Sequence, residues 1–322
     1  MSPVALPAGY EPPEPAEELS VRSADGIRLH VEVHGQPGAP TVVLSHGWTC
    51  STAFWAPVIR ELADRYRVVV YDQRGHGHSE IPPSRARYST RALAEDLTAV
   101  LLRTVPAGER AVLAGHSMGG MTIMAAGGRP EVAERTAANV LISTGPAGLV
   151  AELTVLPPAL RAPAVRRFLH RRLLLSRLPL GPVTPVSRAA LKYATMGPGS
   201  SAGQVEATAR IVHACPTAVR ANWAGVLGRL DVRAGLGRIT APTAVVVGTA
   251  DRLTPPAHAH RIVEELADAQ GLLLLPGVGH MAPLERPVEV AAEIHRMAAA
   301  HLAPDARPAA PAATTTERTT AA

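Results

Sequence analysis

The chain has 322 residues, of which 47% are hydrophobic and 18% are charged, and its mean hydropathy is +0.10. These values are typical of a globular protein with one large domain, or with a core and an insertion, and they exclude a collagen-like or wholly low-complexity chain. The formal net charge is only +5, from 32 Lys and Arg against 27 Asp and Glu, and six arginines between residues 161 and 177 account for the excess, so the remainder of the chain is not expected to bind polyanions.

The two ends of the chain differ in composition from the rest. Residues 1–17 are rich in Pro, Glu and Ala and lack the basic and apolar regions of a signal peptide, and residues 304–322 consist largely of Pro, Ala and Thr. Such segments cannot bury a core, so we expect two disordered tails. No uncharged apolar run approaches the roughly 18 residues of a membrane span, and Cys50 and Cys215 have neither disulfide-framework nor zinc-site spacing. We therefore expect a soluble, cytoplasmic protein.

Between the tails, strand and helix patterns alternate. A turn signal at Asp25-Gly26, followed by alternating apolar residues from Ile27 to Val33, predicts a hairpin whose other strand is residues 19–23. Six dense apolar runs follow, at residues 41–44, 68–71, 111–114, 140–143, 244–247 and 272–275. Helical patterns lie among them, at residues 55–64, 90–102, 118–126, 256–267 and 287–301. Dense runs are typical of strands covered on both faces, so we predict an α/β fold with a mostly parallel sheet and helices on both faces.

Residues 146–238 interrupt this alternation with helical patterns but no convincing strand. We expect them to form a helical cap inserted into a core of residues 18–145 and 239–303. Six arginines lie between Arg161 and Arg177 with no acidic residue among them, and apolar residues including Phe168 recur at helical spacing. The pattern predicts a cap helix with a solvated basic side, and weak contact with acidic substrates or an anionic lipid surface is the alternative. No nucleic-acid motif accompanies the arginines. Residues 197–201 are expected to form a flexible turn.

The sequence Gly115-His116-Ser117-Met118-Gly119 stands between a predicted strand and a predicted helix. A nucleophile at such a junction lies on a tight turn, where its hydroxyl projects and the next backbone N–H points at a developing oxyanion. Glycines on either side relieve the crowding that the turn creates. The pentapeptide alone is a weak signal, but its position makes Ser117 a specific candidate nucleophile.

Together with four further motifs, this pattern makes residues 19–301 resemble the α/β-hydrolase fold family, in its serine esterase and lipase-like branch with a cap insertion. The motifs are His46-Gly47-Trp48 after the third strand, residues 71–79 after the fourth, Gly248-Thr249-Ala250-Asp251 after the seventh and Gly277-Val278-Gly279-His280 after the eighth. They occur in the order that the family has.

The resemblance implies a proton relay among three distant residues. Ser117 would be the nucleophile, and His280 would take its proton, because a neutral alcohol attacks poorly without a base. Asp251 would orient the imidazole and stabilise its charged form. The end of the sixth strand offers no carboxylate, so the alternative acid position of some relatives is absent.

The resemblance also implies an oxyanion site and a pocket. The backbone N–H groups of Trp48 and Met118 would hold the oxyanion, and Trp48, His116 and Phe168 would line the substrate pocket. His116 is expected mainly to serve the turn, and His46 to brace the loop that carries Trp48.

No cofactor and no metal are expected. The pairs His76/His78 and His258/His260 could suggest metal ligands, but neither has a nearby cysteine or a consistent carboxylate partner. No glycine-rich phosphate loop or dinucleotide fingerprint follows a strand.

The leading hypothesis is a serine hydrolase that cleaves carboxylic esters of small or medium acyl groups, or lipid-like esters, through an acyl-serine intermediate. C–C bond hydrolases, thioesterases and cofactor-free haloperoxidases or perhydrolases of the same fold are alternatives. Dehalogenases and epoxide hydrolases use an aspartate nucleophile, so Ser117 argues against both. A ligand-binding protein on the hydrolase fold is the non-enzyme alternative, although a binder would not need Ser117, Asp251 and His280 together. The sequence does not indicate an oligomeric state.

Overall fold

The computed structural model describes residues 5–155 and 181–302. Its strands are β1 (Glu17–Arg22), β2 (Arg28–His34), β3 (Thr41–Ser45), β4 (Arg67–Tyr71), β5 (Ala111–His116), β6 (Thr136–Ile142), β7 (Thr243–Gly248) and β8 (Ala269–Leu275). Each expected run coincides with one of them. The difference is largest at β6, whose first residues are buried but contain Thr, Ala and Asn rather than a dense apolar run.

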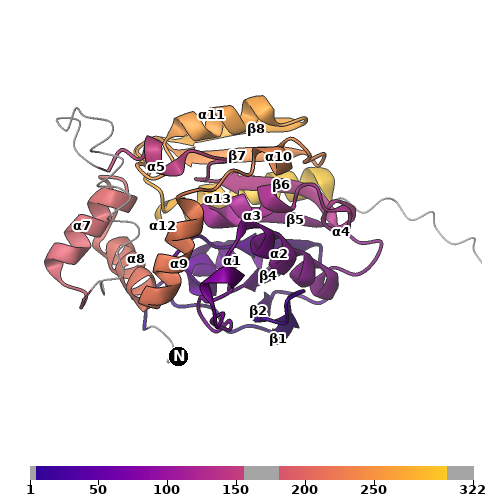
Figure 1. The fold of residues 1–322 in the computed structure, drawn as a ribbon, viewed down its shortest axis with the longest axis horizontal. Coiled ribbons are helices and arrows are strands. Elements are labelled where there is room, and N and C mark those ends of the chain that lie inside the picture. The colour runs from indigo at the N-terminus through magenta and orange to yellow at the C-terminus, as the bar shows by residue number, and fades with distance from the viewer. Residues whose placement is uncertain (1–4, 156–180, 303–322) are drawn as a thin grey trace, which may run out of the picture.

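The strands form one eight-stranded sheet in the order β1-β2-β4-β3-β5-β6-β7-β8 (Figure 1). β2 pairs antiparallel with β1 and with β4, whereas every other neighbouring pair is parallel. The predicted mostly parallel sheet is therefore confirmed. Because parallel strands end at the same edge, the loops after β3, β5, β7 and β8 are brought to one end of the sheet.

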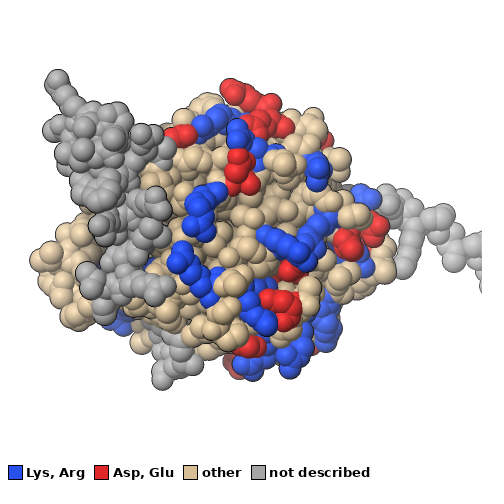
Figure 2. Space-filling model, in the orientation of Figure 1, with Lys and Arg blue, Asp and Glu red and all other residues tan. Residues whose placement is uncertain are grey.

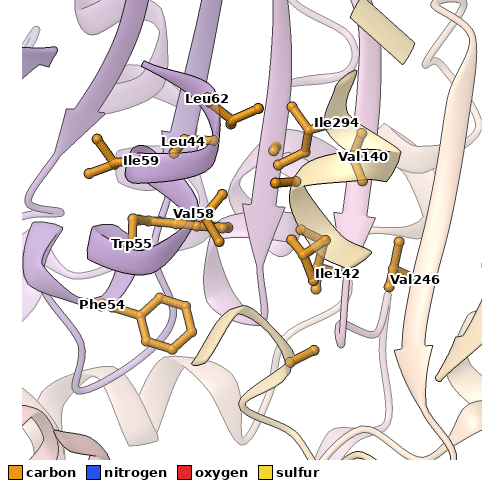
Figure 3. Close-up of a cluster of buried hydrophobic side chains, with 14 of the residues drawn as sticks. Leu44, Phe54, Trp55, Val58, Ile59, Leu62, Val140, Ile142, Val246 and Ile294 are labelled. Atoms are coloured by element: carbon orange, nitrogen blue, oxygen red, sulfur yellow. The ribbon is translucent and has the colours of Figure 1, made fainter. Parts of the chain in front are cut away.

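Successive residues of the central strands are buried in two separate cores. On one face, Leu44, Val140 and Val246 pack against α1 (Ala56–Leu62) and α13 (Pro287–His301), as Figure 3 shows. On the other face, the neighbouring strand residues pack against α2 (Thr90–Thr104), α3 (Met118–Ala126) and α11 (Pro256–Glu265). This two-sided burial explains why the strands are dense apolar runs rather than alternating ones.

The core helices begin near the expected residues. The side chain of Ser89 accepts the N–H of Ala92 at 3.1 Å and caps α2, and Pro256 and Pro287 stand in the first turns of α11 and α13. Several short elements were not expected from the sequence: η1 (Thr52–Trp55), η2 (Arg85–Arg87), α4 (Pro130–Glu134) and α12 (Ala282–Glu285). They are too short to show a helical period.

The insertion between β6 and β7 is helical in its described part, with α5 (Leu149–Glu152), α7 (Pro185–Thr195), α8 (Ala202–Ala214), α9 (Thr217–Leu227) and α10 (Arg233–Leu236). An isolated bridge between Ala147 and Asp231 joins its two ends. In Figure 1, α7, α8 and α9 lie beside one end of the sheet, at the left. Phe168 and the arginines of residues 161–177 lie outside the described residues, so the cap helix and the lipid contact expected there stay predictions.

Residues 5–16, which we expected to belong to a tail, contact the folded protein. Leu6 is buried, and Arg60 donates hydrogen bonds to the carbonyl groups of Gly9 and Glu11. From the cap, Arg210 donates to the carbonyl of Ala5 at 2.6 Å. Composition did not reveal these contacts because most of them are made by the backbone.

Within the two described ranges, no helix is long and apolar enough to cross a membrane. On the face shown in Figure 2, basic and acidic side chains are interspersed over the core. Among the described residues, pairs such as Arg91–Glu95 (2.6 Å) and Arg233–Asp231 (2.5 Å) bring opposite charges together. Exposed pairs of this kind contribute little to stability, but they break up any field of a single sign.

Candidate active site

The end of β5 carries Ser117 on a tight turn into α3. Its backbone has φ 52° and ψ −115°, a region that residues other than glycine rarely occupy. The Ser117 carbonyl accepts hydrogen bonds from Thr144 Oγ1 at 2.7 Å and from the N–H of Met121 at 3.1 Å. The turn is also crowded, because a Cβ on Gly119 would lie 2.0 Å from the carbonyl oxygen of Ser45. This is the strained strand-to-helix turn that the sequence predicts.

The loops after β7 and β8 bring Asp251 and His280 together. His280 Nδ1 lies 2.9 Å from Asp251 Oδ2, and Nδ1 carries the proton because a carboxylate only accepts. Asp251 Oδ1 accepts the N–H groups of Leu253 and Thr254, each at 2.9 Å, and Oδ2 accepts Thr254 Oγ1 at 2.9 Å. Burial acts to raise the pKa of Asp251, but His280 and these hydrogen bonds outweigh it and hold the pKa below its usual value. The carboxylate is therefore ionised at neutral pH, and Nε2 of the imidazole is left to accept a proton.

The peptide of His280 is fixed from two directions. Its N–H donates to the carbonyl of Thr195, at the end of cap helix α7, at 2.8 Å. Its carbonyl accepts a hydrogen bond from His116 Nε2 at 2.8 Å. Burial lowers the pKa of His116 to about 3, so this ring is neutral. His116 is only 1% exposed, which leaves it no surface to offer a substrate, so its expected place in the pocket is corrected to support of the His280 loop.

Glu285, in α12, joins the His280 loop to the cap. Its carboxylate accepts the N–H of Gly279 at 3.0 and 3.1 Å, the N–H of Gly197 at 2.7 Å and the hydroxyl of Ser200 at 2.8 Å. The side chain is buried, with 4% exposed. The turn of residues 197–201, expected to be flexible, is thus anchored to the core. Sequence reasoning missed Glu285 because its cap partners are 85 and 88 residues away; the available signal was an acid among apolar residues shortly after His280.

The loop after β3 lies against the serine turn. A Cβ added to Gly47 would lie 3.2 Å from Ser117 Cβ and 2.7 Å from His116 Nδ1, so the approach requires glycine. His46 braces this loop as expected. Its Nδ1–H donates to the Gly47 carbonyl at 2.7 Å, and its Nε2 accepts the N–H of Gln73 at 3.0 Å. Close backbone packing therefore positions the residue that follows, Trp48, beside the nucleophile candidate.

Trp48 and Met118 lie where this loop, the serine turn and the cap meet. Met118 begins α3, so its N–H has no acceptor within the helix. Both side chains pack in a small apolar cluster with Trp223 of cap helix α9, and Trp48 Nε1–H donates to the carbonyl of Arg220 at 3.1 Å. Trp48 remains partly exposed, and its place in the substrate pocket stays a prediction. The other expected pocket residue, Phe168, lies outside the described ranges.

The predicted residues lie in one region at the end of the sheet. They are connected by contacts between Gly47 and Ser117, His116 and His280, and His280 and Asp251. Among the described residues, the Ser117 hydroxyl and the His280 ring form no direct hydrogen bond. In unliganded active sites this contact is commonly long and shortens when substrate binds. The arrangement offers a strained serine, an imidazole whose Nδ1 is hydrogen-bonded to a carboxylate, and an ionised acid.

Metal-ligand side chains gather elsewhere. Within the described parts of the chain, one group of three, His30, Asp72 and His78, has potential ligand atoms close together. None of the three belongs to the region around Ser117 just described. The sequence drew attention to His78 but paired it with His76, whose ring instead accepts the N–H of Thr49 at 3.2 Å.

Residues 40–287 match the family model of the alpha/beta hydrolase fold. The chain therefore belongs to the alpha/beta hydrolase family. It is 37% identical to the probable oxidoreductase EphD of Mycobacterium bovis over 123 residues, which are 38% of this chain but only 21% of that protein. It is 32% identical to a putative carbamate hydrolase, RutD, of Variovorax paradoxus over 257 residues, covering 78% of this chain and 89% of that one. A thermophilic esterase from Thermogutta terrifontis has the same fold, with a TM-score of 0.70 at 24% identity over 89% of this chain and 100% of that chain.

Proposed function

We propose that this alpha/beta hydrolase cleaves carboxylic esters through an acyl intermediate on Ser117. The observation that carries the proposal is the serine on a strained turn beside the buried, hydrogen-bonded pair of His280 and Asp251. This arrangement suits acyl transfer, because a neutral hydroxyl needs a base and the base needs a fixed tautomer. The Variovorax paradoxus relative, whose name describes hydrolysis of a carbamate, is consistent with chemistry at a carbonyl group.

In the proposed reaction, His280 Nε2 takes the proton of Ser117 as the serine oxygen attacks the ester carbonyl carbon. The carbonyl oxygen becomes an oxyanion that accepts the N–H groups of Met118 and Trp48, each worth about 3 kcal/mol in an enclosed site. The bond to the alcohol oxygen then breaks, and the imidazolium returns the proton to that oxygen. Water attacks the acyl-serine in the same way and releases the carboxylic acid. Asp251 stays ionised and stabilises the imidazolium in both halves.

The acyl group is proposed to lie between the serine turn and the cap. Trp48 is partly exposed there, and it shares an apolar cluster with Met118 and Trp223 of the cap. An apolar wall favours an uncharged acyl chain of small or medium size, because a charged group would lose hydration without gaining a partner. We also propose that residues 161–177, with their arginines and Phe168, contribute to this substrate pocket.

The Ser117→Ala variant tests the nucleophile. We expect kcat for p-nitrophenyl acetate to octanoate to fall about 10⁶-fold, because the base and acid cannot act without the hydroxyl. A fluorophosphonate probe should label the wild-type protein at Ser117, located by peptide mass spectrometry. Thioesters and C–C substrates in the same panel identify the bond that is cleaved.

The matched control is Ser143→Ala. Ser143 also has a positive φ, 46°, at the end of the adjacent strand β6, and its buried hydroxyl has no partner in the described structure. It should retain wild-type hydrolysis, which separates loss of the nucleophile from strain at a positive φ. Retention of most activity in Ser117→Ala would overturn the proposal. A folded wild-type protein that takes up no probe would instead be a binding protein on this fold.

A further inference from the structure

A cluster of histidines and carboxylates lies between β2 and the loop after β4 and is not used in the reaction proposed above. His30 comes from β2, and Asp72 and His78 follow β4. One potential ligand atom from each lies within 4.8 Å of the other two. His30 and Asp72 are largely buried, whereas His78 is exposed.

The two imidazoles have the mutual geometry of ligands on one metal ion. Their ring centroids are 5.0 Å apart and their planes are 87° to each other. Two imidazoles whose nitrogens lie about 2 Å from one tetrahedral zinc ion have ring centroids about 5 Å apart. Their donor atoms would then be about 3.3 Å apart, and the exposed side chain of His78 is free to rotate into that distance.

Hydrogen bonds already orient the other two ligands. His30 Nε2 lies 3.0 Å from Glu32 Oε1, so this nitrogen donates to the carboxylate and Nδ1 is left to bind. A carboxylate behind a histidine is the usual support for a metal-binding imidazole. Asp72 is fixed by the N–H groups of Thr52 and His78, at 2.9 and 2.8 Å, each of which uses one lone pair of one oxygen. Glu32 is itself held by Thr52 Oγ1 at 2.7 Å.

Charge and access also favour a cation. Glu32 and Asp72 are both buried, and within the described residues neither forms an ion pair with a Lys or Arg; the basic side chains beside them are histidines. A divalent ion bound here would supply positive charge beside two buried carboxylates that lack a Lys or Arg partner among the described residues. A cavity of about 130 Å³ reaches Glu32, Asp72 and His78 and gives an ion and a bound water a way in.

We propose that His30, Asp72 and His78 bind a divalent transition-metal ion of the zinc type, with Glu32 orienting His30. Two imidazoles and a carboxylate are a ligand set that zinc accepts, with one further position open to water. The ion would tie β2 to the loop after β4. It would also lie beside Thr52, close to the loop that carries Trp48, so its first effect is on the stability of this side of the core.

The test uses the full chain after dialysis against EDTA. Titration with zinc chloride by calorimetry should show one equivalent bound per chain and a higher thermal midpoint. Cobalt(II) should give the visible absorption of a four-coordinate site. His78→Asn should weaken zinc binding at least tenfold, and Glu32→Gln by about 10- to 100-fold through loss of support for His30.

Two controls separate this site from other histidines and from the reaction. His260→Asn removes an exposed histidine on α11 and should bind zinc as the wild type does. Ser117→Ala should also bind zinc normally, so failure of the esterase proposal would leave this one intact. Since His78 is exposed, His78→Asn should keep the wild-type thermal midpoint in EDTA and lose only the increase caused by zinc.

Absence of saturable zinc uptake would overturn the proposal. Equal loss of affinity in His260→Asn would do the same, because it would indicate scattered surface histidines. A cobalt spectrum with only the weak bands of a six-coordinate aqua ion would overturn the assigned geometry even if every variant failed to fold.

Discussion

At the scale of single residues, the proposed active site depends on how buried charge is satisfied. Asp251 is a buried carboxylate, and it stays ionised because an imidazole, two backbone N–H groups and the hydroxyl of Thr254 all face it. Those bonds also decide which nitrogen of His280 carries the proton. Asp251 therefore determines that His280 can act as a base through Nε2.

Asp251→Asn should show this dependence. The amide keeps the shape but can donate, which favours the tautomer with the proton on Nε2 and removes the base that Ser117 needs. We expect kcat to fall about 10⁴-fold with little change in KM, measured with p-nitrophenyl acetate. Asp231→Asn, at an exposed ion pair with Arg233, is the control and should retain activity. A loss below tenfold in Asp251→Asn would contradict the assigned role.

His116 predicts a pH dependence of stability. Its pKa is about 3 when folded and about 6.5 when unfolded, so between these values the unfolded chain takes up a proton that the folded chain does not. The contribution of His116 to the free energy of unfolding is therefore fully present above pH 6.5. It is lost as the pH falls toward 3, at up to about 1.4 kcal/mol per pH unit.

The measurement is urea unfolding of wild type and His116→Gln at several pH values from 7 to 5. Glutamine can still donate to the His280 carbonyl but does not titrate, so the decline in unfolding free energy should be shallower in the variant. His260→Asn, which removes an exposed histidine, should decline as the wild type does. Parallel curves for wild type and His116→Gln would rule the explanation out.

Local motifs made Ser117, Asp251 and His280 predictable as candidates, because each stands in a short pattern directly after a strand. Thr254, Thr195 and Glu285 were not predictable in the same way. Their roles arise from hydrogen bonds across the fold, and a threonine carbonyl or an isolated glutamate carries no signal of that kind in one sequence. The contacts that hold the site together were thus harder to predict than its reactive groups.

At the scale of elements, the cap and the core share the support of His280. The end of α7 accepts the N–H of His280, and Glu285 of α12 joins Gly279 to Gly197 and Ser200 in the turn before α8. A shift of the cap would therefore move the loop that carries the proposed base. Sequence periodicity indicated helices in the insertion but could not indicate these bonds.

Glu285→Ala should separate positioning from folding. It leaves two buried N–H groups without their acceptor, so we expect a lower thermal midpoint and a fall in kcat of up to about 100-fold from displacement of His280. Glu285→Gln retains one acceptor oxygen and should recover part of the loss. The rate of fluorophosphonate labelling, measured well below the melting temperature, reports on activation of Ser117.

The control for this pair is Glu289→Ala, which removes a half-exposed acid of α13 that lies 3.6 Å from Arg286. It should leave both the midpoint and the labelling rate unchanged. A lower midpoint in Glu285→Ala with an unchanged labelling rate would mean that Glu285 serves stability alone.

At the scale of the whole molecule, the fold is a sheet with a buried hydrophobic core on each face. Dense apolar runs predicted the strands, and their alternation with helical patterns predicted the parallel sheet, since burial on both faces leaves a strong signal in composition. The packing of residues 5–16 was not predictable, because their contacts are made chiefly by backbone carbonyls and by the single buried Leu6. The arrangement of the cap helices was likewise beyond the sequence pattern.

Ile294→Ala tests how much one core contributes. Ile294 is fully buried on α13 against the sheet (Figure 3), so its truncation should lower the unfolding free energy by about 2–5 kcal/mol. Val288→Ala, at a position on the same helix that is 58% exposed, should change it by less than about 0.5 kcal/mol. Urea denaturation at 25 °C checks both variants, and similar small effects would contradict the described packing.

The bond between the Thr195 carbonyl and the His280 amide restricts how this protein can acquire a new specificity. Replacing the insertion with that of a relative would also replace the carbonyl group that holds the backbone of His280. The replacement insertion would have to place a backbone carbonyl next to the His280 N–H. It would also need a tight turn whose N–H and hydroxyl groups can donate to the carboxylate of Glu285. Fewer donor segments satisfy this than matching length and hydrophobicity would suggest, so chimeras should be selected on these two junctions before the pocket itself is redesigned.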